Sequence, residues 1–141
     1  MKYDAFIGSV ARRAGMPEEQ AVALTHACLQ TLAERITGGE AWDLAAELPK
    51  ELRERMRTSR GPAESFDLDE FHRRVGERSG MDPAAVQQAA PAVLATLREA
   101  VSAGEFQDVV AQLPRDFSQL IEPSAAYRAG TASPGQVPRR R

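Results

Sequence analysis

The sequence predicts an all-α protein built from two homologous four-segment helical repeats that pack into one pseudo-twofold helical bundle. Three observations support this prediction. The 141 residues include 24 alanines and 16 arginines, and both residue types favour helices. Apolar residues recur at helical spacing, as Phe6, Ile7 and Val10 do near the start of the chain. The chain also repeats itself without a gap at an offset of 65 residues, so that residues 4–56 align with residues 69–121.

The repeat is visible as identities held in a single register. Seventeen of the 53 aligned positions are identical, which is about 32%. The identical residues are of several types, namely apolar residues, glycine, proline, threonine and charged residues. In the first copy they include Phe6, Val10, Arg13, Gly15, Thr31, Leu32, Glu34, Glu40, Asp43 and Pro49. We therefore expect a first repeat at 1–57, a linker at 58–66, a second repeat at 67–123 and a disordered tail at 124–141, where helical periodicity is lost.

The first two segments of each repeat have recognisable ends. Gly15 and Gly80 follow an apolar helical face and are predicted to end the first segment in a left-handed conformation. The second segment is predicted to start at Pro17 in the first copy. In the second copy, Asp82 followed directly by Pro83 is typical of a helix start. Pro91 falls inside the second segment of the second repeat, where we expect a kink or a local break.

The third and fourth segments are shorter. A glycine break at Gly38–Gly39 precedes the third segment, which is predicted to begin at Glu40 and, in the second copy, at Glu105. Pro49 and Pro114 then interrupt the helix and can start a short fourth one.

The most specific repeated block reads G-E-x-x-D-[LV]-x-A-x-L-P and occurs at residues 39–49 and 104–114. Together with the stretch FDLDEFHRRVGERSGMDP at 66–83, this block resembles a bacterial family catalogued as domain of unknown function 2267. The resemblance covers about residues 2–121. It implies an all-helical bacterial protein and no particular activity.

Charge and cysteine content limit the function classes. The formal charge is −2, made of 0 for residues 1–60, −6 for 61–123 and +4 for 124–141, which excludes a wholesale polyanion binder of histone type. Cys28 is the one cysteine, so no intramolecular disulfide is possible, as is common for cytoplasmic proteins. The first residues do not resemble a signal peptide, and no run approaches the ~20 apolar residues of a membrane span. We expect a cytoplasmic protein without membrane contact.

Four duplicated acidic residues, Glu40, Asp43, Glu105 and Asp108, form the first candidate site. Each copy places two carboxylates three residues apart on one helix face, and two such pairs brought together can ligate a hard cation. A simpler interpretation is that an acid in the first helical turn complements the helix dipole. Because neither glutamate has the histidine three residues later that di-iron bundles use, we expect no metal here.

His26, Cys28 and His72 are a second set, considered for zinc or a Cys–His nucleophile pair. His26 and Cys28 lie two residues apart and so point to different sides of a helix. Cys28 lies on the apolar stripe, which favours a core position. No catalytic residue or cofactor is assigned to this set.

A third candidate is the basic stripe formed by Lys50, Arg53, Arg57 and Arg60, whose spacing places four cations on one helical face. Nucleic-acid phosphates can bind such a stripe, and the arginines at 139–141 can add to it. A solvated helix end explains the same pattern, because cations are favoured there and Glu51 and Glu54 lie between them.

These observations favour a non-enzymatic helical interaction or adaptor module, for example a stress-associated scaffold, whose partner is a protein. The chain contains no phosphate-binding glycine loop, nucleophile elbow, CxxC pair or HExxH helix. The alternative is a nucleic-acid-associated protein that uses the basic stripe and the arginine tail. A metal-dependent enzyme acting through the duplicated acidic pairs is the third possibility.

Overall fold

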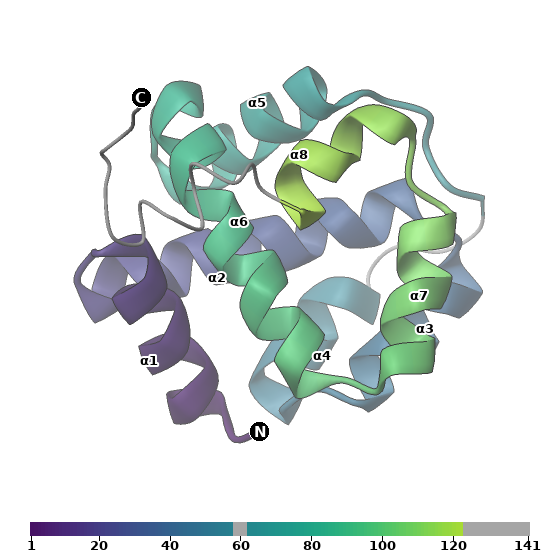
Figure 1. Cartoon of the computed structure of the whole chain (residues 1–141), viewed down its shortest axis with the longest axis horizontal. Helices are drawn as coiled ribbons and strands as arrows, with labels where there is room; N and C mark the ends of the chain where they lie inside the picture. Colours follow the sequence, from purple (N-terminus) through teal and green to yellow (C-terminus); the bar gives the residue numbers. More distant parts are fainter. Residues whose placement is uncertain (58–61, 123–141) are drawn as a thin grey trace, which may run out of the picture.

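The computed structural model describes residues 1–57 and 62–122, and every regular element in these two ranges is a helix (Figure 1). The predicted all-α class is confirmed. The first half contains α1 (Tyr3–Ala14), α2 (Glu18–Arg35), α3 (Gly38–Ala46) and α4 (Lys50–Arg57). The second half contains α5 (Leu68–Ser79), α6 (Pro83–Ala100), α7 (Ala103–Ala111), the 3-10 turn η1 (Arg115–Phe117) and α8 (Ser118–Ile121). Part of the predicted linker, and the predicted tail at 124–141, lie outside the described residues.

The helices of the two halves correspond in their bounds. α5, α6 and α7 begin and end 65 residues after α1, α2 and α3. The fourth segment differs, because α4 is one helix of eight residues whereas η1 and α8 divide the same stretch in the second half. Below, the counterpart of a residue is the residue 65 positions away in the other half.

The glycines predicted to end the first helix of each half do so. Gly15 and Gly80 have φ of 67° and 78°, in the left-handed region that favours glycine. At the start of α5, the Asp67 side chain accepts a hydrogen bond from the backbone N–H of Glu70 at 3.0 Å. Gly15 thus ends α1, and Asp67 and Gly80 mark the two ends of α5.

The predicted start of the third helices at Glu40 and Glu105 is wrong by two residues. α3 begins at Gly38 and α7 at Ala103, so the glycines belong to the first helical turn. Thr37 and Ser102 are the caps, and the hydroxyl of each accepts a hydrogen bond from the backbone N–H three residues on, at 3.2 Å. The cap hydroxyl satisfies one of the free N–H groups of the first turn, which offsets the low helix propensity of glycine.

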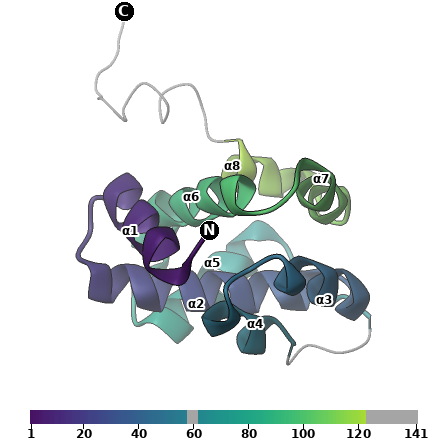
Figure 2. The ribbon, with the colours of Figure 1, turned by 90° about the horizontal axis from the view of Figure 1, so that it is seen from below.

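A single apolar core joins the two halves. α1 packs on α6, and α5 packs on α2, so each first helix covers the long helix of the other half. Figure 2 shows α6, α7 and α8 as one layer over α2, α3 and α4. The largest fully buried side chains come from both halves and include Phe6, Leu24, Leu32, Phe71, Leu94 and Phe117. Burial of these side chains is the main source of stability.

α6 continues through Pro91 from Pro83 to Ala100, so the predicted local break is absent. Proline has no N–H and therefore leaves the carbonyl of Gln87, four residues earlier, without its helical partner. Pro91 itself is buried, and packing on both sides of α6 outweighs the loss of one hydrogen bond.

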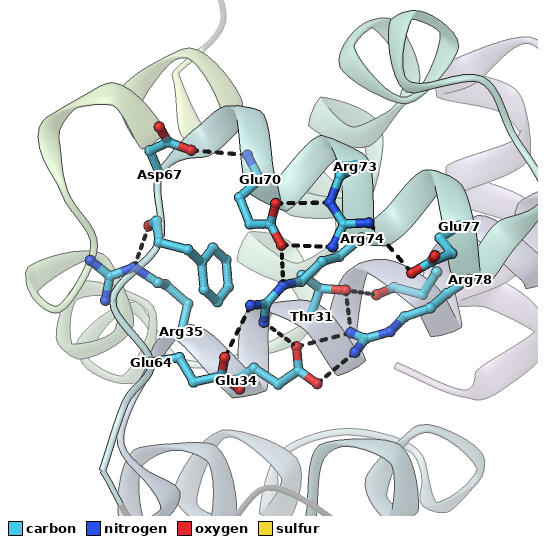
Figure 3. A network of polar contacts seen from close by, with 12 residues as sticks. Thr31, Glu34, Arg35, Glu64, Asp67, Glu70, Arg73, Arg74, Glu77 and Arg78 are labelled. Atoms are coloured by element: carbon cyan, nitrogen blue, oxygen red, sulfur yellow. Dashed lines mark hydrogen bonds and ion pairs between the residues drawn. The ribbon is translucent and has the colours of Figure 1, made fainter.

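Polar contacts also bind α5 to α2 (Figure 3). Arg78 donates to the hydroxyl of Thr31 at 2.8 Å and to the two carboxylate oxygens of Glu34 at 3.0 and 2.7 Å. Arg74 donates to the same carboxylate at 2.9 Å. Thr31 in turn donates to the carbonyl of Ala27, so its hydroxyl both accepts and donates a hydrogen bond.

The counterpart contacts bind α1 to α6. Arg13 donates to the hydroxyl of Thr96 at 2.9 Å and pairs with Glu99. Thr96 donates to the carbonyl four residues earlier, as Thr31 does. Ser9 takes the place of Arg74 and lies 3.2 Å from the Thr96 hydroxyl. The same arginine, threonine and glutamate therefore hold both helix pairs together.

No helix in the described part of the chain is long and apolar enough to cross a bilayer.

Candidate functional site

Three of the four predicted acidic residues meet where α3 and α7 begin. One carboxylate oxygen each of Glu40, Asp43 and Glu105 lie within 4.8 Å of one another. Within residues 1–57 and 62–122, this is the one group of three or more potential metal ligands of the His, Cys, Asp or Glu type. Asp108 is exposed and does not belong to it. The structure thus brings the two halves together at this point, but not with four ligands.

Reciprocal hydrogen bonds across the two helices position this cluster. The backbone N–H of Thr37 donates to the side-chain oxygen of Gln112 at 2.8 Å. In the other direction, the backbone N–H of Ser102 donates to Glu47 at 2.7 Å. Because Thr37 and Ser102 also cap α3 and α7, these bonds fix the first turns of the two helices against each other, and with them the glutamates in those turns.

The cluster contains a carboxyl group whose pKa is raised. One oxygen, Oε2, of both Glu40 and Glu105 is buried, and neither atom has a hydrogen-bond partner in the described part of the chain. Burial raises the pKa of Glu105 to about 8, with further contributions from the facing Glu40 and from the charges of Asp43 and Glu47. A protonated Glu105 supplies the donor that the facing carboxylate needs. Chemically, the two glutamates can share one proton beside a third carboxylate.

The basic stripe is divided among several contacts. Lys50 is exposed, whereas Arg53 donates from Nε to the carbonyl of Leu48 at 2.9 Å. The guanidinium of Arg57 lies 4.2 Å from the centre of the Trp42 ring. Arg60 falls outside the described residues. Two of the three described cations are therefore already engaged by the protein itself.

Trp42 is a surface feature that sequence reasoning missed. Its side chain is 44% exposed, and the other large exposed hydrophobic residue in the described ranges is Met1. Arg57 stacks on the indole ring, and its Nε is buried without a hydrogen-bond partner among the described residues. The counterpart of Trp42 is Gln107. An aromatic residue in one copy, aligned with an amide in the other, is the signal that could have drawn attention to it.

His26, Cys28 and His72 have separate environments. Nε2 of His26 lies 3.0 Å from the hydroxyl of Tyr3, and burial together with the charge of Arg55 lowers the His26 pKa. Cys28 is fully buried, which raises the pKa of its thiol and disfavours the reactive thiolate. His72 borders a cavity in the second half. The three do not form a ligand group in the described residues.

Comparison with known proteins extends the resemblance found in the sequence. Residues 3–120 match the model of the family described as "Uncharacterized conserved protein (DUF2267)". The chain belongs to this family. No curated protein matches the sequence of this DUF2267 protein. Family membership therefore agrees with the helical fold and leaves the function to be inferred from the surfaces described above.

Proposed function

We propose that this DUF2267 chain is a non-enzymatic helical interaction module that binds a protein partner through the surface around Trp42 and Arg57. The exposed, arginine-stacked Trp42 is the observation that carries this proposal. Tryptophan and arginine are the residue types most enriched among residues that dominate the energy of protein interfaces. Stacking also holds the two side chains in place before binding, which reduces the entropy cost of ordering them at an interface.

The division between duplicated and unique contacts supports the same proposal. The pairs that join the halves, such as Arg13 with Glu99 and Arg78 with Glu34, occur in both copies. Trp42 occurs in one copy only. We infer that the two repeats are related by a pseudo-twofold axis that serves folding, and that binding belongs to the surface where they differ. We also propose that the module acts in the bacterial cytoplasm.

Affinity purification from native cells tests this proposal, with nuclease treatment and mass spectrometry. The variant Trp42→Gln introduces the amide that the second half carries, and Gln107→Ala is the matched control on α7. Circular dichroism must show both variants folded. We expect one protein to be recovered with the parent chain and with Gln107→Ala, and lost with Trp42→Gln. Equal recovery with Trp42→Gln would contradict the proposal.

The two other functions lead to different outcomes in that experiment. Material that disappears on nuclease treatment favours the nucleic-acid alternative, in which the basic stripe of Lys50, Arg53, Arg57 and Arg60 and the arginine tail contact phosphates. A metal-dependent enzyme requires ion binding at Glu40, Asp43 and Glu105, which metal content measures directly.

A further inference from the structure

A cavity of about 710 Å³ lies between α5, α6 and α8. Of these helices, α8 is the yellow-green one in Figure 1. Its buried residues are Leu68, His72, Pro91 and Leu120. The exposed residues that line it come from α6 and from the end of the described chain, and they are Ala84, Gln87, Gln88, Ser118, Gln119 and Glu122. The volume falls within the range of small-molecule sites, and an apolar floor with a polar rim is their usual composition.

His72 is the polar group of the floor. It is 7% exposed, and no hydrogen bond joins its ring to another residue of the described chain. Burial lowers its pKa, against the opposing charge of Asp69, and so favours the neutral form of the ring. A neutral imidazole offers one hydrogen-bond donor and one acceptor. Its ring nitrogens are not among the buried atoms that lack a partner, so they open to the solvent that fills the cavity, where a ligand can reach them.

The first half uses the same positions differently. The counterparts of Leu68 and Pro91 are Tyr3 and His26, whose side chains lie within hydrogen-bond distance of each other at 3.0 Å. The second half has two apolar residues in place of this polar pair, and it has a histidine where the first half has Ile7. The fourth segment is also divided into η1 and α8 there. Divergence of the second copy has thus produced an apolar floor with one imidazole, whose ring packs edge-to-face with that of Phe71 and makes no hydrogen bond to another described residue.

The lining residues determine the charge of the ligand. Among the ten of them, Glu122 is the one formal charge at pH 7, and no lysine or arginine is present. Anions such as nucleotides therefore meet no cation and one carboxylate. Three glutamine amides and a serine hydroxyl around the rim offer both donors and acceptors.

We propose that this cavity binds an uncharged aromatic heterocycle of nucleoside size. Its flat face would pack on Leu68, Pro91 and Leu120, its edge would exchange hydrogen bonds with His72, and the rim amides would meet its remaining polar groups. This site is separate from the Trp42 surface and does not depend on the function proposed for that surface.

Titration of the full chain, followed by amide and imidazole NMR signals, tests the proposal. The probe is adenosine, and adenosine 5′-monophosphate is the control ligand, which differs from it by a charged phosphate. We expect saturable shifts at His72, Gln87 and Leu120 with adenosine, and binding of the monophosphate to be about tenfold weaker. Absence of saturable shifts with adenosine, or equal binding of the two probes, would overturn the proposal.

Three variants locate the site. Leu68→Tyr with Pro91→His introduces the polar pair of the first half and should abolish the adenosine shifts. Because that double variant changes buried residues, the exposed Gln87→Leu and the similarly sized His72→Phe are tested as well, each with its thermal melting point. Loss of one hydrogen bond should weaken binding about two- to tenfold in each. Unchanged affinity in both folded single variants would contradict the assigned site.

Discussion

Arg78 of α5 binds both carboxylate oxygens of Glu34 on α2, at 3.0 and 2.7 Å. The counterpart pair, Arg13 and Glu99, makes the same link between α1 and α6. The two pairs differ in their surroundings, because the Glu34 side chain is 19% exposed and also binds Arg74, whereas the Glu99 side chain is 54% exposed. The same duplicated residues thus provide an internal comparison of how burial changes the strength of an ion pair.

Removing the charge at these two positions should therefore have unequal effects. We expect Glu34→Gln to lower the free energy of unfolding by about 1–2 kcal/mol, because the partly buried Arg78 loses its carboxylate partner, while Arg74 keeps Glu64 and Glu70. Glu99→Gln should cost less than about 0.5 kcal/mol, as is usual for a solvent-screened pair. Urea denaturation of the two variants measures both values. Equal losses would show that burial does not control these contacts.

The carboxyl pair predicts a specific pH dependence. The pKa of Glu105 is about 8 in the folded chain and about 4.5 when unperturbed, so the folded state holds the proton more tightly. The stability that this proton contributes is complete below pH 4.5 and is lost as the pH rises to 8. Glu105→Gln mimics the protonated acid and should raise the free energy of unfolding by about 1 kcal/mol or more at pH 8.5, with little effect at pH 5.

Urea denaturation of Glu105→Gln between pH 5 and pH 9 checks this expectation. Asp108→Asn is the control, since Asp108 is exposed on the same helix and lies outside the cluster. A variant less stable than the parent chain at pH 8.5 would indicate that the charged carboxylate is needed, as in a cation site.

Metal removal gives a separate test of the cluster. We expect excess EDTA, and added calcium or magnesium, to leave the melting temperature of the full chain unchanged, because protonation of one facing glutamate removes the need for a cation there. A structural ion bound to the folded state would instead raise the melting temperature by mass action and lower it on chelation. Differential scanning calorimetry distinguishes the two results.

The divided basic stripe leads us to expect no salt-dependent binding of duplex DNA by the full chain at about 50 mM salt, where phosphate contacts are strongest. Fluorescence anisotropy with a labelled duplex measures this. Observed binding that weakens with salt, and a salt dependence flattened by neutralising Arg53, Arg57 and Arg60 together, would establish the nucleic-acid alternative instead.

Much of the fold could be predicted because the chain contains two versions of the same pattern. Apolar spacing and the paired Gly15 and Gly80 gave the class and the ends of the first helices. The starts of α3 and α7 were predicted two residues too late because glycine usually breaks a helix. Here the hydroxyls of Thr37 and Ser102 cap the helices, so each helix begins directly after its cap and includes the glycines. Local propensity could not predict the continuity of α6 through Pro91, because tertiary packing decides it.

The candidate site was predicted only in part. Duplication placed Glu40, Asp43 and Glu105 among the candidates. The sequence does not predict how α3 and α7 are oriented, and this orientation leaves Asp108 outside the cluster. Trp42 was missed because one aromatic residue on a helix is more often in the core than at the surface. Its exposure depends on which face α3 turns toward its neighbours, and this is a property of the packed structure.

The behaviour of residues 1–60 alone tests most directly whether the two halves depend on each other. Each first helix packs on the long helix of the other half, so the isolated half lacks the partner that covers its apolar faces. A unit of this size buries only about 60% of its unfolded surface and is marginal by itself. Circular dichroism with analytical ultracentrifugation should find the fragment either largely unfolded or a homodimer that reproduces the contacts of the full chain. A folded monomer that melts cooperatively would mean that the halves are independent domains and would contradict the shared core.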